Sequence, residues 1–179
     1  MNYVEYLKSI RACNEAILAA QGMTAQQSWD KCERGDWMLW LIGKLSGGPD
    51  CAKRKRLVLT TCKCARLGLI YIPDDEKRPL RAIEAAEQWA RGENGITSDD
   101  VEIAANAANA AANAAYAANA ANAVYAANAA NAAYDAYAAN AAAYAAYAAY
   151  AAETLKQCAD IVRADYPISP AVEIIGENK

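Results

Sequence analysis

An alanine-rich tract from Ala104 to Ala152 limits what this chain can fold into more than any other feature. Alanine fills roughly two of every three positions, and asparagine or tyrosine fills most of the rest. Alanine is the best helix former, and asparagine and tyrosine each cost less than about 0.7 kcal/mol relative to it. Disordered segments are rich instead in charge, proline, glycine and serine. The tract is therefore predicted to be helical.

The spacing within the tract indicates more than one helix. From Asn113 to Asn140 an asparagine or tyrosine recurs at every third residue. Each step of three falls about 60° short of a full helical circle, so nine steps carry the row around the helix about one and a half times. Near both ends of the tract a step of four restores a single face. We expect a break between Asn119 and Asn131, because asparagine tolerates the left-handed conformation that ends helices. The tract then forms two or three helices folded back on each other.

Outside the tract, apolar residues recur at helical spacing. The predicted helices cover residues 2–21, 24–35, 37–42, 51–72, 78–91 and 153–166. Residues typical of helix ends mark their boundaries: Gly22, Thr24 with Gln27, Asp36, Asp50, Gly92, Thr97 with Asp100, Pro167 and Pro170. The tail after Pro170 is expected to lie along the surface.

The segment 51–72 admits a strand, because it contains valine, threonine and isoleucine. Its apolar and small residues nevertheless recur at intervals of four, four, three and four, at Leu57, Thr61, Ala65, Gly68 and Ile72. This spacing favours a helix. Further apolar residues lie on the opposite side, which predicts a central helix packed by several neighbours.

Composition excludes several classes of function. The chain has 179 residues and a net charge of -3, which does not indicate a non-specific nucleic-acid binder. Its N-terminus lacks the apolar core of a signal peptide, and no stretch approaches the roughly 20 apolar residues of a membrane span. We therefore expect a cytoplasmic protein with no membrane partner, whose six cysteines are reduced and mostly buried.

The chain contains no histidine. Catalytic sites in which histidine activates a serine or cysteine nucleophile are therefore excluded, and the usual general base near neutral pH is missing. The pair Cys62 and Cys64 does not have zinc-site spacing. The sequence thus predicts a non-enzyme with no metal and no cofactor.

A row of cations is the main candidate for ligand binding. Lys53, Arg56, Thr60 and Lys63 fall within about 100° of one helix face, with Arg66 at its edge. The row is either a solvated basic face or an anion site partly desolvated by neighbouring leucines. The tract's tyrosines and asparagines either pack between helices or line a cleft, where rings would stack on a nucleotide-like ligand. The candidate ligand-binding residues are Lys53, Arg56, Lys63, Arg66, Tyr116, Tyr137, Asn140, Tyr144 and Tyr147.

Tryptophans and acids give weaker indications. Trp37, Trp40 and Trp89 are expected in the core, although Trp29 and Trp37 flank a loop and are alternatively exposed anchors for a partner. Glu84 and Glu87 share one helix face. We expect them to form ion pairs with the nearby arginines Arg78, Arg81 and Arg91 rather than to act as catalytic acids.

Three pieces of the sequence resemble a bacterial and phage family of toxin-immunity proteins, the immunity-protein-five-like domain. They are GDWMLWLIGKL, RLVLTTCKCARLGLIYIPDDEKRPLRAIEAAEQWARGE and the alanine-rich tract that follows. The resemblance implies an all-helical binding protein that confers immunity against a toxin. It supplies no catalytic residues.

These observations predict a single all-α domain over residues 1–179, a bundle of six to eight helices that includes an alanine-rich helical hairpin. Residues 1–100 would form its core, 101–166 the alanine-rich helices and 167–179 the tail. The expected function is stoichiometric neutralisation of a toxin or defence effector. The alternatives are a sponge that sequesters a small anionic nucleotide-type signal, and a scaffold whose alanine helices self-associate into a homo-oligomer.

Overall fold

The computed structural model describes residues 1–48, 51–71, 74–104, 106 and 151–176. Within these ranges every regular element is a helix, which confirms the all-α prediction. The helices are α1 (Tyr3–Ser9), α2 (Asn14–Ala19), α3 (Ala25–Lys31), α4 (Gly35–Leu45), α5 (Ala52–Arg66), η1 (Leu69–Tyr71, a 3-10 helix), α6 (Arg78–Arg91), α10 (Ala151–Asp165) and α11 (Pro170–Ile175). Residues 98–104 are also helical. The expected six to eight helices are too few, even for the described part of the chain.

Most of the alanine tract lies outside the described residues. The predicted break between Asn119 and Asn131 falls there. The candidate ligand-binding residues of the tract also lie outside the described residues: Tyr116, Tyr137, Asn140, Tyr144 and Tyr147. Those predictions stay predictions.

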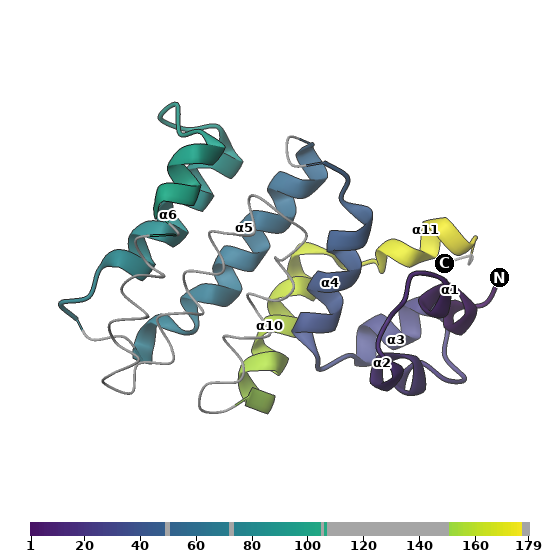
Figure 1. The fold of residues 1–179 in the computed structure, drawn as a ribbon. Coiled ribbons are helices and arrows are strands. Elements are labelled where there is room, and N and C mark those ends of the chain that lie inside the picture. The colour runs from purple at the N-terminus through teal and green to yellow at the C-terminus, as the bar shows by residue number, and fades with distance from the viewer. Residues whose placement is uncertain (49–50, 72–73, 105, 107–150, 177–179) are drawn as a thin grey trace.

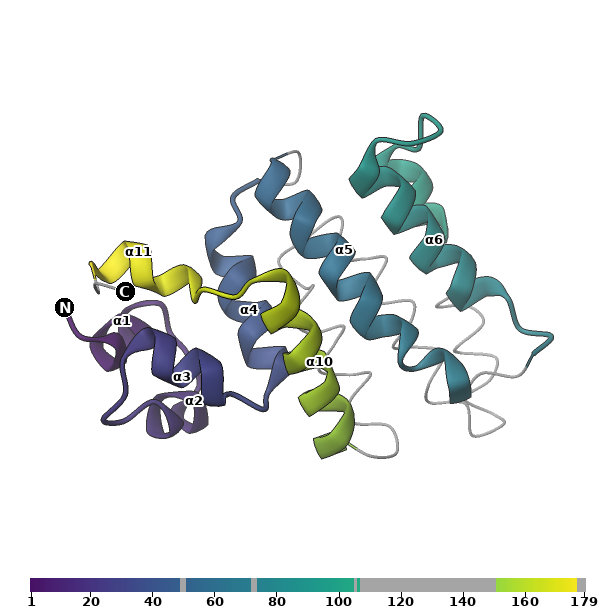
Figure 2. The ribbon, with the colours of Figure 1, turned by 180° about the vertical axis from the view of Figure 1, so that it is seen from behind.

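Helix α5 is the central element of the bundle. It packs against α6 on one side and against α4 and α10 on the other (Figures 1 and 2). Leu57, Val58 and Cys62 are fully buried along it. The helix predicted over residues 51–72 is confirmed from Ala52 to Arg66 but ends there, and the separate 3-10 helix η1 follows it. Its central position is confirmed, since apolar side chains on two sides need neighbours on two sides.

Helices α4 and α10 cross at very short range, although more than 100 residues separate them in the chain. Gly35, the first residue of α4, lies against Cys158 and Ala159 of α10. A Cβ atom added to Gly35 would stand 2.7 Å from the Ala159 backbone nitrogen. Only glycine permits this approach.

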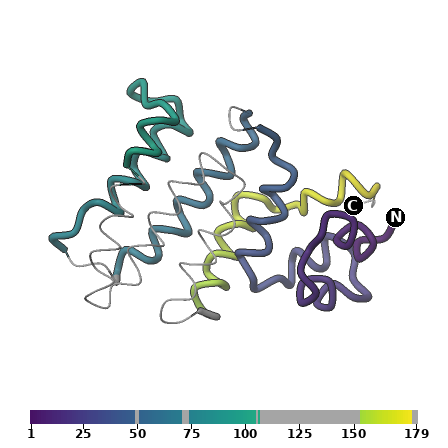
Figure 3. The backbone as a smooth tube through the Cα atoms, viewed as in Figure 1, coloured from purple at the N-terminus to yellow at the C-terminus, as the bar shows by residue number. Residues whose placement is uncertain are grey.

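The N-terminal helices form a small group beside α4 (Figure 3). The single helix expected over residues 2–21 is wrong, because the chain turns between α1 and α2. Arg11 there adopts the left-handed conformation, with φ 62°. The Arg11 and Ala12 amides donate to the carbonyls of Lys8 and Leu7, the Schellman pattern that ends a helix.

The predicted helix ends are partly confirmed. The capping box of Thr24 and Gln27 and the left-handed Gly92 after α6 are present. Thr97 and Asp100 exchange hydrogen bonds of 2.8 and 3.2 Å at the start of the helical residues 98–104. Asp36 is not a cap, because α4 begins one residue before it.

The C-terminal tail differs from the prediction. Pro170 begins helix α11 rather than ending a helix, since proline fits the first helical position and Ser169 caps it. Ala171 and Val172 are buried, so α11 is part of the packed structure rather than a surface tail. It contacts α1, α3 and α4 and so brings the last described helix to the first (Figure 1).

Candidate functional site

The cation row of α5 meets an acid at the end of α10. Lys63 Nζ lies 2.6 and 2.8 Å from the two carboxylate oxygens of Asp165. The Thr60 hydroxyl donates to the same carboxylate at 2.6 Å. The Arg56 guanidinium donates to the Asp165 backbone carbonyl and lies 4.4 Å above the Tyr166 ring. The end of helix α10 and Tyr166 just after it thus provide interaction partners for Arg56, Thr60 and Lys63, the middle of the row.

Arg66 at the edge of the row is bound by α6. Its guanidinium forks onto the Glu87 carboxylate, with both N–O distances 2.9 Å. The hydrogen bonds that Arg66 donates to Glu87 raise the pKa of Arg66. Glu87 also pairs with Arg91 one turn later, at 3.6 Å, which confirms that expected ion pair. Arg78 pairs with Glu76 instead of Glu84 or Glu87.

Three of the four predicted cations are therefore engaged by protein groups. Asp165 and Glu87 are far from the row in sequence, which is why its local spacing did not reveal them. This geometry favours a structural role for Arg56, Lys63 and Arg66. Lys53 is exposed, and an anion site formed with the tract's tyrosines stays a prediction.

We expect Asp165→Asn to lower the free energy of unfolding by about 1 kcal/mol at pH 7, because it removes a partly buried charged pair. Burial would raise the pKa of Asp165, but hydrogen bonds from Lys63 and Thr60, with the nearby cations, outweigh it and lower the pKa. A lowered folded-state pKa stabilises the protein above the unfolded pKa of about 3.9, and the gain is lost as the pH falls below it.

Urea unfolding at pH 7 and at pH 3 measures this effect. The difference between wild type and Asp165→Asn should be largest at pH 7 and should shrink at pH 3. Asp160→Asn is the matched control, because Asp160 is an aspartate on the same helix whose ion pair, with Arg163, is formed by an exposed carboxylate. An equal difference at both pH values would contradict the assignment.

A second candidate site lies between the N-terminal helices and α4. A cavity of about 520 Å³ opens there, lined by residues of α1, α2, the end of α3 and the first half of α4. We call it the tryptophan cavity, because Trp29, Trp37 and Trp40 all line it. Other apolar lining residues are Tyr3, Leu7, Met38 and Leu41.

The tryptophans differ in role. Trp29 is 2% exposed and donates its indole N–H to the Tyr166 carbonyl at 2.8 Å. The prediction of Trp29 as an exposed anchor is therefore wrong. Trp89 is buried and Trp40 packs against the core, as expected. Trp37 is only half-buried and lines the cavity, so it keeps the alternative role of an anchor.

Charged groups hold the cavity wall in place. Arg34 forks onto Asp36 with distances of 2.8 and 2.6 Å. The same guanidinium lies 4.4 Å over the Trp37 ring. A cation over an aromatic face is attractive, and here the cation is itself fixed by a buried carboxylate. Trp37 is thus preorganised.

The buried cysteines are structural. Cys62, Cys64 and Cys158 are fully buried free thiols. Cys13 is exposed and Cys32 and Cys51 are half-buried, so the prediction that most of the six are buried holds for only half of them. Burial raises the pKa of Cys62, which keeps its thiol protonated and unreactive.

Among the described helices, none is both long and apolar enough to cross a membrane. Comparison of the chain with family models, with curated proteins and with solved structures gives no match.

Proposed function

We propose that this chain is a non-catalytic binding protein that neutralises a toxin or defence effector by occupying it at a fixed ratio. The observation that carries the proposal is the tryptophan cavity. Its volume of about 520 Å³ falls within the range of roughly 300–1,000 Å³ typical of small-ligand pockets, so it has room for a few inserted side chains of the effector. Tryptophan and arginine are the residues that most often dominate binding energy at protein interfaces.

The resemblance to toxin-immunity proteins supports the same interpretation. The first matching piece, GDWMLWLIGKL, is helix α4, and its first half forms one wall of the cavity. Arg34, Trp37 and Trp40 come from this wall or from the residue before it. The segment that carries the resemblance therefore also carries the candidate binding site.

The paired cations of α5 argue against the sponge. A site for an anionic signal needs cations that gain their partner when the ligand arrives. Lys63 and Arg66 already hold carboxylates at hydrogen-bonding distance. An anion would have to displace Asp165 or Glu87, which costs the interactions that those acids make.

Growth rescue tests the proposal. Each protein encoded beside this gene is expressed in a bacterial host with and without the chain, and the purified pair is titrated by calorimetry. We expect one of them to be toxic alone and to be neutralised at a fixed molar ratio. The proposal is wrong if none is neutralised, or if a sub-stoichiometric amount suffices, which would indicate turnover.

Trp37→Ala should weaken effector binding by about 30-fold or more, the loss typical of an interface hot spot. Trp37 lies outside the core cluster of the described residues, so the variant should keep its circular dichroism spectrum. Ile70→Ala is the matched control, because Ile70 is exposed and does not line the cavity. Equal losses in both variants would contradict the assignment of the cavity as the binding site.

A further inference from the structure

The tryptophan cavity has an apolar and preorganised body. Leu7, Met38 and Leu41 are buried side chains of its wall, and Trp37 and Trp40 remain partly exposed. Arg34 over the Trp37 ring and Lys44 at 5.4 Å over the Trp40 ring hold both indoles. Rings that are held in advance cost less to order on binding. A flat apolar group fits this surface, because aromatic rings stack on one another.

The charges that line the cavity are not balanced. Arg34 and Asp36 neutralise each other through their fork. The remaining charged lining residues are Arg11 and Lys31 against Glu33. Glu33 also lies 3.7 Å from Lys156 of α10, so its negative charge is shared with a cation outside the cavity lining. The cavity therefore presents a net positive charge to whatever enters it.

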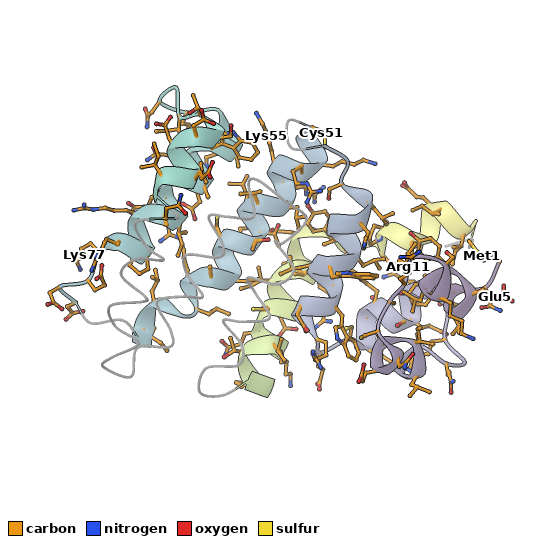
Figure 4. All side chains as sticks on the ribbon, in the orientation of Figure 1. Met1, Glu5, Arg11, Cys51, Lys55 and Lys77 are labelled. Atoms are coloured by element: carbon orange, nitrogen blue, oxygen red, sulfur yellow. The ribbon has the colours of Figure 1, made fainter. Side chains whose placement is uncertain are left out.

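Arg11 lines the cavity in an unfavourable backbone conformation. It occupies the left-handed position that ends α1, where a residue with a side chain is disfavoured by roughly 1 kcal/mol relative to glycine. Figure 4 shows Arg11 where the group of α1, α2 and α3 meets α4. Strain of this kind in a cavity wall is a reason to look for function in the side chain.

From these observations we propose that the tryptophan cavity binds an aromatic anion: a flat ring system beside a single negative charge, presented by an acidic, aromatic segment of the partner protein. This inference rests on the proposed function, because it names the group that the effector inserts. The rings stack against the indole wall formed by Trp37 and Trp40. The negative charge lies near Arg11 and Lys31.

Two dyes that share one ring system test the chemistry. 8-Anilinonaphthalene-1-sulfonate carries a sulfonate, and N-phenyl-1-naphthylamine is the same body without it. Both are titrated into the full chain, with binding followed by dye fluorescence excited through tryptophan. Both dyes should bind at one site, and Trp37→Ala should weaken both.

Charge variants distinguish the contribution of the negative charge to dye binding from the contribution of the rings. Lys31→Gln should weaken the sulfonate dye about threefold, and Arg11→Gln with Lys31→Gln about tenfold, the size expected for exposed charge pairs. The neutral dye should change less than about twofold. Lys8→Gln is the matched control, since Lys8 is an exposed lysine of α1 outside the cavity lining. The inference is overturned if the double variant leaves sulfonate binding unchanged, or if both dyes weaken equally.

A displacement experiment tests whether the effector supplies the aromatic anion. It also distinguishes a failure of this inference from a failure of the proposed function. One equivalent of the neutralised effector, added to the dye-loaded protein, should reduce the fluorescence to that of free dye. If the effector binds and the dye stays, the proposed function stands and the inference about its inserted group fails. If the charge variants discriminate the dyes but no effector is neutralised, the proposed function fails and the cavity is a site for a free aromatic anion instead.

Discussion

Replacing Gly35 by alanine should destabilise the protein by about 3 kcal/mol, although the same change in an isolated helix stabilises it by about 1 kcal/mol. Gly35 begins α4 at the crossing with α10. An added Cβ would stand 2.7 Å from the Ala159 nitrogen and 2.8 Å from the Cys158 carbonyl carbon. These are backbone atoms, which cannot rotate away as a side-chain end can. The two helices must therefore separate, and the close packing of interiors transmits that shift to α5.

Gly48→Ala is the matched control for this prediction. Nothing lies within 4 Å of a Cβ added at Gly48, which is exposed and does not adopt a positive φ. Its free energy of unfolding should change by less than about 1 kcal/mol. Urea unfolding followed by circular dichroism measures both variants. A Gly35→Ala protein as stable as wild type would show that α4 and α10 do not approach as closely as the structure has them.

The sequence predicted those elements whose signals are local. The helix spacing of α5, the capping box at Thr24, and Gly92 in the left-handed position all depend on residues within one or two turns. Such patterns reflect backbone hydrogen bonds that neighbouring residues satisfy by themselves. The all-α class follows from the sum of these signals.

The turn between α1 and α2 escaped prediction for a physical reason. Helices usually end at a left-handed glycine, and here Arg11 takes that position. The apolar spacing runs across the turn, so periodicity alone gives one helix. The burial of one face of α1, formed by Tyr3, Tyr6 and Leu7, stabilises this arrangement of the two helices. Tertiary packing outweighs the local cost.

The candidate sites escaped prediction because they are assembled from distant segments. Asp165 reaches Lys63 across 102 residues, and nothing in the spacing of either helix indicates this pair. The tryptophan cavity likewise needs three short helices to meet α4. The helix predicted over residues 37–42 contains both Trp37 and Trp40, but whether they line a core or a cavity depends on how closely the neighbouring helices approach.

Leu57→Ala should lower the free energy of unfolding by about 3–4 kcal/mol, a large share of the stability of a domain of this size. Leu57 is 0% exposed in the middle of α5. Its helix is held by α6 on one side and by α4 and α10 on the other, so the space left by the lost methyl groups cannot close by a simple shift of one neighbour. The cost therefore includes both the lost burial of apolar surface and the cavity that remains.

Leu18→Ala is the control for this central position, because Leu18 on α2 is 62% exposed and its truncation leaves no internal space. It should change the free energy of unfolding by less than about 0.5 kcal/mol. Urea denaturation of both variants gives the comparison, and the slope with urea should stay constant if both fold to the same compact state. A loss at Leu57 no greater than that at Leu18 would mean that α5 is a peripheral helix. The packing of α10, with Asp165, against the cation row would then be wrong as well, since that row lies on α5.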